Sequence, residues 1–148
     1  AYLYMSMAAY FESLNMSGMA QWMKTQVQEE LTHGVKFFDF IHDRGGRTQL
    51  AQIAAPKTDW DSPLNAFQEA YEHEQHISSC INKLVDLSIA ESDHALNTFL
   101  QWFVNEQVEE EAAVEAIVQK LQLVGDNGVA LFMIDGELGK RTAVEAEQ

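Results

Sequence analysis

The sequence has one cysteine and no long apolar run, and each of these two features excludes a class of protein. Cys80 is the only cysteine in 148 residues, so the chain forms no internal disulfide and offers no zinc finger or thiolate cluster. A single thiol is typical of a reducing compartment, and we therefore expect a cytoplasmic protein. No stretch of roughly 18 uninterrupted apolar residues occurs, so we predict no transmembrane helix and no membrane partner.

Basic residues are also scarce. Nine Lys and Arg residues stand against 23 Asp and Glu residues, which gives a formal net charge of −14. Binding to a nucleic-acid backbone needs clustered Lys and Arg, so we expect no nucleic-acid partner. An acidic surface attracts and concentrates cations, although solubility alone also explains such a charge.

Helical patterns dominate the chain. Apolar residues recur at helical spacing from the start, as Tyr4, Met7 and Phe11 show. The clearest helix start is Ser62 as N-cap followed by Pro63 as the first helical residue. Turn and capping residues divide the chain into five predicted helices, which span residues 1 to about 14, 19–44, 63–92, 93–124 and 129–138.

The connection from Gly45 to Asp61 has no convincing helix or strand pattern. Fully extended, its 17 residues span roughly 55 Å, which is enough to run the length of a helix of roughly 40 Å. Two helical hairpins joined by one long crossover make a four-helix bundle. We therefore predict an all-α fold over residues 1–148 as a single domain, with one long crossover loop and a short fifth C-terminal helix.

Three predicted helices carry acidic residues in line with their apolar stripes, near mid-length. Glu30 holds this position in the second helix, Glu74 in the third, and Glu106 and Glu110 in the fourth. A buried, unpaired carboxylate costs at least several kcal/mol. No Lys or Arg occupies these stripes near the same level, so a bound metal is the simplest compensation. Shared protons or basic partners from elsewhere are the alternatives.

Spacing and residue type narrow the choice of metal. Glu30 and His33 are three residues apart and therefore project from one helix face. Glu74 and Glu110 lie equally far from the turn between the last two long helices, which places them at one level of a hairpin. Carboxylates with one imidazole suit iron, manganese or zinc better than copper or an iron–sulfur cluster. The first helix offers no matching acid, so we expect a further ligand to precede Ala1, where the chain already reads as helix interior.

Several blocks of the sequence together resemble the prokaryotic non-haem ferritins, members of the ferritin-like di-iron family, across essentially the whole chain. The blocks are AAYFES at residues 8–13, QEELTH at 28–33, WDSPL at 60–64, YEHE at 71–74, FLQWFV at 99–104 and EQVEEE at 106–111. In combination they are far more specific than any single motif. The resemblance implies a ferritin-like bundle that binds iron and no haem.

The resemblance also implies a di-iron ferroxidase centre. In the family's arrangement Glu30 would bridge two irons, and His33 would complete one metal site. Glu74 and Glu110 would complete the other. The family's remaining Glu would lie about one helical turn before Ala1.

Further residues match positions around that centre. Gln107 would lie close to the irons, and Tyr4 matches a tyrosine that can supply an electron. Glu29, Glu106 and Glu109 match residues that form an adjacent third iron site in many members.

The function implied by the resemblance is iron storage and detoxification. The protein would oxidise Fe(II) to Fe(III) with O2 or H2O2 and store a ferric mineral inside a shell of 24 identical subunits. The alternatives are another di-iron carboxylate bundle protein and a non-catalytic metal-binding helical scaffold. A bacterioferritin would need a second Glu-x-x-His, and Glu110 is followed by Ala113 at that position.

Overall fold

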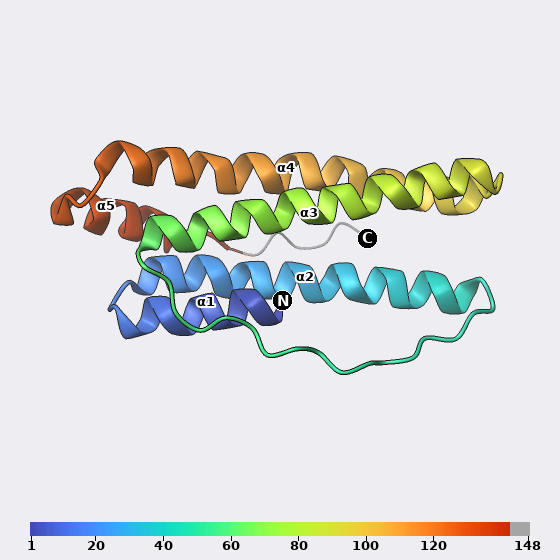
Figure 1. The fold of residues 1–148 in the computed structure, drawn as a ribbon, viewed down its shortest axis with the longest axis horizontal. Coiled ribbons are helices and arrows are strands. Elements are labelled where there is room, and N and C mark those ends of the chain that lie inside the picture. The colour runs from blue at the N-terminus through green and yellow to red at the C-terminus, as the bar shows by residue number, and fades with distance from the viewer. Residues whose placement is uncertain (143–148) are drawn as a thin grey trace. The chain divides into compact units, whose positions relative to one another are not determined.

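The computed structural model describes residues 1–142, which form five α-helices joined by turns and one long connection (Figure 1). All five predicted helices are confirmed, and each end lies within two residues of its predicted position. In chain order the helices are α1 (Tyr2–Ser13), α2 (Ser17–Asp43), α3 (Pro63–Ala90), α4 (His94–Val124) and α5 (Gly128–Leu138).

The helices fall into two compact units. Of the described residues, the first unit comprises 1–60 and 126–142, and therefore contains α1, α2 and α5. The second unit comprises Asp61–Gly125 and contains α3 and α4. Residues 143–148, the end of the predicted single domain, lie outside the described residues, and the organisation as one domain stays a prediction.

The first unit is built on a hairpin of α1 and α2, which pack along each other (Figure 1). Tyr4, Met7 and Phe11, the residues at helical spacing in the sequence, are all fully buried. The turn after α1 places Asn15 at φ +58°, in the left-handed region that Asn tolerates better than most residues. The local sequence thus explains both the buried face of α1 and the tight turn that follows it.

Helix α5 docks on the start of α2 through a very close backbone approach. A Cβ atom added at Gly18 would lie 1.7 Å from the carbonyl oxygen of Asp135, so only glycine fits there. The carboxylate of Asp135 accepts a hydrogen bond of 2.8 Å from the backbone N–H of Met19 and so satisfies a free amide in the first turn of α2. Ile134 and Leu138 supply the buried apolar side of α5.

The long connection between α2 and α3 returns along the α1–α2 hairpin as an extended segment without helix or strand (Figure 1). Two contacts anchor it near its end. Ser6 Oγ donates a hydrogen bond of 2.6 Å to the carbonyl oxygen of Lys57. The buried ring of Trp60 packs edge-on against Tyr10, with 5.2 Å between ring centroids. This is the crossover that the length of the segment predicted.

The second unit is a hairpin of α3 and α4, and both helices begin at side-chain caps. Ser62 Oγ accepts from Asn65 N–H at 3.1 Å, with Pro63 in the first turn, as the sequence predicted. Asp93 Oδ1 accepts from Leu96 N–H at 3.0 Å and caps α4. These caps fix where each helix starts.

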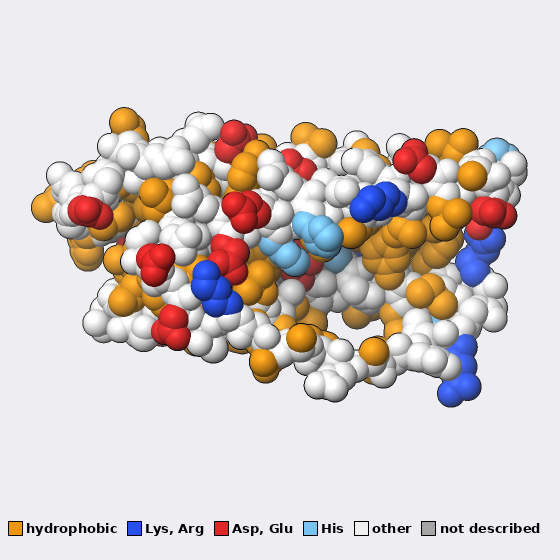
Figure 2. Space-filling view, in the orientation of Figure 1, with side chains coloured by type: hydrophobic (Ala, Val, Ile, Leu, Met, Phe, Trp, Pro, Cys, Tyr) orange, Lys and Arg blue, Asp and Glu red, His pale blue; other side chains and the backbone are white. Residues whose placement is uncertain are grey.

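Two surface properties bear on function. Within the described residues, no helix combines the length and the apolar character needed to cross a membrane. The face drawn in Figure 2 carries acidic side chains spread among apolar ones, in keeping with the net charge of −14.

Candidate metal centre

The first unit presents Glu30 and His33 side by side on α2. His33 Nδ1 lies 3.8 Å from Glu30 Oε2, and the two side chains are 13% and 19% exposed respectively. Gln26, one turn earlier and fully buried, donates from Nε2 to Glu30 Oε1 at 3.4 Å. An imidazole nitrogen and a carboxylate oxygen therefore share one partly shielded helix face, as their spacing predicted.

In the second unit, Glu74, Gln107 and Glu110 are buried polar side chains on the facing sides of α3 and α4. Glu74 on α3 is 0% exposed, and Gln107 and Glu110 on α4 are 6% and 4% exposed. Gln107 Nε2 lies 3.2 Å from Glu74 Oε2 and 3.2 Å from the backbone oxygen of Glu74. Glu110 follows Gln107 by three residues and therefore lies on the same face of α4.

A serine extends this network. Ser78, one turn after Glu74, accepts from Gln107 Nε2 at 3.3 Å and donates through Oγ to the carboxylate of Glu111. Neither Ser78 nor Glu111 was predicted as part of the site. Their only sequence signal is helical spacing, since each lies one turn or less from a residue that was predicted.

The remaining predicted residues differ in their surroundings. Tyr4 is fully buried in α1. Glu106 on α4 is partly buried, whereas Glu109 is exposed. Helical spacing places Glu106 and Glu110 on one face of α4, with Glu109 on the flank.

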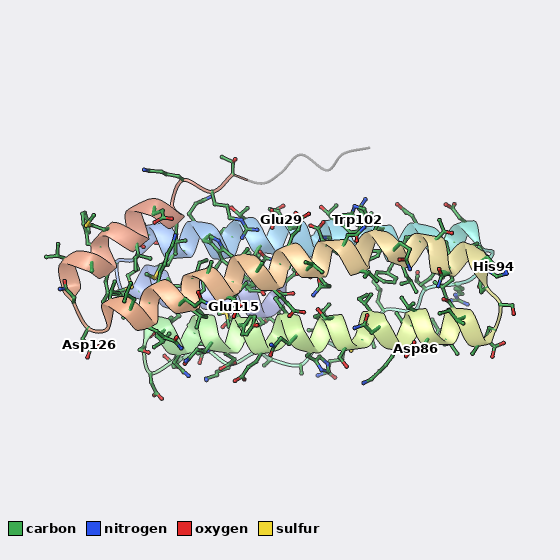
Figure 3. The ribbon with its side chains drawn as sticks, turned by 90° about the horizontal axis from the view of Figure 1, so that it is seen from above. Glu29, Asp86, His94, Trp102, Glu115 and Asp126 are labelled. Atoms are coloured by element: carbon green, nitrogen blue, oxygen red, sulfur yellow. The ribbon has the colours of Figure 1, made fainter. Side chains whose placement is uncertain are left out.

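Glu29 has a partner that the sequence did not predict. Arg141, which follows α5, forms an ion pair with the Glu29 carboxylate and donates from Nη1 to Gln26 Oε1 at 2.9 Å. Its guanidinium carbon lies 4.3 Å from the ring centroid of Trp22. Arg141 belongs to none of the long-helix stripes, and 112 residues separate it from Glu29. Figure 3 labels Glu29 on α2.

The chemistry of these donors fits a divalent cation. Buried carboxylates such as Glu74 and Glu110 cost several kcal/mol unless a cation or strong donors compensate them. The amide of Gln107 is a neutral donor to Glu74, so this contact by itself does not cancel a negative charge. Carboxylate oxygens with one imidazole form a ligand set for iron, manganese or zinc. The helical fold and these side chains are typical of a protein class that binds such cations through carboxylates.

Comparisons with known proteins narrow this class. Residues 1–124 match the family described as a ferritin-like domain. A bacterial non-heme ferritin from Bacteroides fragilis is 46% identical over 139 residues, which cover 94% of this chain and 86% of that protein. The bacterial non-heme ferritin of Staphylococcus aureus is 37% identical over 142 residues, which cover 96% of this chain and 86% of that protein.

Solved structures agree. An open-pore ferritin from the archaeon Archaeoglobus fulgidus is 49% identical, with a TM-score of 0.94, covering 95% of this chain and 87% of that one. An engineered closed form of the same ferritin is 48% identical, with a TM-score of 0.95, covering 97% and 87%. The chain belongs to the ferritin family and has the ferritin fold, a four-helix bundle with a short C-terminal helix. The predicted family and fold class are thereby confirmed, and membership supports iron binding and iron storage.

Proposed function

We propose that this chain is the subunit of a cytoplasmic iron-storage ferritin that oxidises Fe(II) to Fe(III) with O2 or H2O2. Glu74 and Glu110 carry the proposal, because these two carboxylates are buried on adjoining helices of one unit. A charge held there is costly without a cation, and the family supplies iron as that cation.

Iron is the substrate of the proposed reaction, and each ligand has a distinct role. Glu30 bridges two Fe(II) ions, His33 completes one metal site, and Glu74 and Glu110 complete the other. The carboxylates favour Fe(III) over Fe(II), because the attraction between an anion and a cation grows with the charge of the cation. Binding therefore favours loss of one electron from each iron to the oxidant.

The surrounding residues assist this reaction. Gln107 donates to Glu74 and so holds that carboxylate in one orientation. Tyr4 supplies an electron from its buried position in α1. Glu29, Glu106 and Glu109 form a third iron site beside the di-iron pair.

A homo-oligomeric shell of 24 subunits completes the proposal. Exposed apolar side chains support assembly, because contiguous apolar surface of this kind usually marks an interface. In α5, Val129, Phe132 and Met133 are at least 70% exposed, which suits a helix that packs against copies of itself and lines channels. The ferric mineral then collects inside the shell.

Anaerobic loading with Fe(II) followed by exposure to air tests the function. The wild-type protein should develop ferric absorbance much faster than Fe(II) in buffer. Glu30→Ala and His33→Ala should assemble normally but oxidise iron at least about tenfold more slowly, because each variant lacks a ligand. Glu115→Ala is the matched control, since Glu115 is an exposed acid on α4 that contacts Gln119.

Each alternative function has its own outcome in this assay. A non-catalytic scaffold would leave the rate at that of Fe(II) in buffer. Another di-iron bundle protein would oxidise iron yet run as a small species in size-exclusion chromatography. Full-rate oxidation by Glu30→Ala would refute the assigned centre.

A further inference from the structure

Arg141 makes three simultaneous contacts with one face of α2. Its guanidinium pairs with Glu29, donates to Gln26 Oε1 at 2.9 Å and lies over the ring of Trp22. The Arg141 and Glu29 side chains are only 21% and 14% exposed, so water and salt screen the pair weakly. The Arg141 guanidinium is therefore held by an ion pair, a hydrogen bond and a cation–π contact at the same time.

Glu29 is therefore already matched with a positive charge carried by the chain itself. We propose that Arg141 competes with metal cations for the Glu29 carboxylate, so that a cation binds there only when the Arg141 side chain leaves α2. This inference rests on the proposed function, in which Glu29 contributes to the third iron site. It adds the residue that sets how tightly that site binds.

Electrostatic repulsion sets the two occupants in competition. Arg141 Nη2 pairs with Glu29 Oε2, and a metal bound by the same carboxylate would lie a few ångströms from the guanidinium, where two cations repel each other strongly at a site shielded from water. Arg141 also lies only three residues beyond the end of α5, and its backbone N–H bonds to Leu138 O at 3.2 Å. Departure of the Arg141 side chain from α2 does not require this backbone hydrogen bond to break.

The same guanidinium connects Glu29 to the proposed bridging ligand. Gln26 accepts from Arg141 at Oε1 while its Nε2 donates to Glu30 at 3.4 Å, so the contact with Arg141 favours the amide orientation that faces Nε2 toward Glu30. When Arg141 leaves, its contact no longer orients the Gln26 amide. Occupation of Glu29 by a cation is thereby linked to the hydrogen bonding of Glu30.

Co2+ binding to the assembled protein tests the competition without any redox step. Equilibrium dialysis with Co2+ should resolve one class of sites that disappears in Glu29→Gln. Arg141→Gln should tighten that class by about tenfold or more, because a charge-assisted contact no longer opposes the metal. In the double variant Arg141→Gln with Glu29→Gln, the gain should vanish.

Lys140→Gln is the matched control, because it removes the same charge from an exposed neighbouring position. It should leave the Co2+ affinity of the Glu29 class unchanged. Two results would overturn the proposal: unchanged or weaker Co2+ binding in Arg141→Gln, or a gain that persists without Glu29. If Arg141→Gln does not fold, Arg141→Lys replaces it. Lysine lacks the planar guanidinium and holds Glu29 less firmly, so Co2+ binding should still tighten measurably.

This test and the test of the proposed function fail independently. If the wild type shows no ferroxidase activity but Arg141→Gln still binds Co2+ more tightly, the oxidation chemistry is rejected and the role of Arg141 is kept. Rapid oxidation that depends on Glu30, with no Co2+ shift in Arg141→Gln, would reject the role of Arg141 alone.

Discussion

Replacing Gly18 with alanine should separate α5 from α2. The added Cβ would lie 1.7 Å from the carbonyl oxygen of Asp135 and 2.6 Å from its carbonyl carbon, whereas ordinary contact begins at 3.4 Å. The obstacle is backbone on both sides, so no side chain can turn away to make room. Helix α5 must therefore move outward by about 1.7 Å, the difference between these distances.

The cost of that movement follows from the contacts it breaks. Inserting a methyl group into a packed site typically costs about 1–3 kcal/mol. The hydrogen bond between Met19 N–H and Asp135, now 2.8 Å, is lost as well and contributes about 1 kcal/mol. We therefore expect Gly18→Ala to destabilise the first unit by about 2–4 kcal/mol. For a chain of this size, that change lowers Tm by about 5–15 °C.

Differential scanning calorimetry of the assembled protein measures this loss, and Gly34→Ala is the control on the same helix. A Cβ at Gly34 meets nothing within 4 Å, and alanine favours a helix over glycine by about 0.5–1 kcal/mol. Gly34→Ala should therefore raise Tm by about 1–4 °C. A Gly18→Ala protein at least as stable as the wild type would refute the close approach of α5 to α2.

Three further predictions follow from other contacts. Glu74→Gln removes a buried charge but keeps an oxygen that accepts from Gln107, so the free energy of unfolding of the metal-free protein should rise by about 1 kcal/mol. Added Co2+ should raise the Tm of this variant less than it raises the Tm of the wild type. An unchanged response to Co2+ would contradict this prediction. Trp60→Ala should lower the free energy of unfolding by about 3–5 kcal/mol, because a large buried ring is lost. It should also speed hydrogen exchange in residues 44–62, since the ring packs the crossover against Tyr10. Unaltered exchange in these residues would contradict that role of Trp60. Tyr4→Phe keeps the buried ring, so it should lower the free energy of unfolding by no more than about 1 kcal/mol. It should abolish any tyrosyl radical signal seen by electron paramagnetic resonance during iron oxidation. A persisting signal would assign the electron to another residue.

Local signals account for the parts of the fold that the sequence predicts. Ser62 and Asp93 cap their helices through the backbone N–H three residues later, so a short stretch of sequence contains the whole interaction. The stripes that hold Glu30, Glu74 and Glu110 follow from helical periodicity alone. Helix positions and the candidate donor residues can therefore be predicted from neighbouring residues in the chain.

Contacts between distant segments cannot be predicted in this way. Gly18 reads as a turn residue, and nothing near it indicates that a backbone 117 residues later lies against it. Arg141 likewise lies in a segment without periodicity, so neither its ion pair with Glu29 nor its contact with Gln26 has a local signal. These pairings depend on how α5 packs on α2, which no property of either segment alone determines.

A crystal grown without oxygen and soaked in Fe(II) tests the central claim most directly. The claim is that Glu30, His33, Glu74 and Glu110 bind the iron that the protein oxidises. Anomalous density should appear within about 2–2.3 Å of carboxylate oxygens from Glu74 and Glu110 and of the imidazole of His33, with Glu30 between two peaks. Iron bound only at surface acids, with no density among these four side chains, would contradict the account.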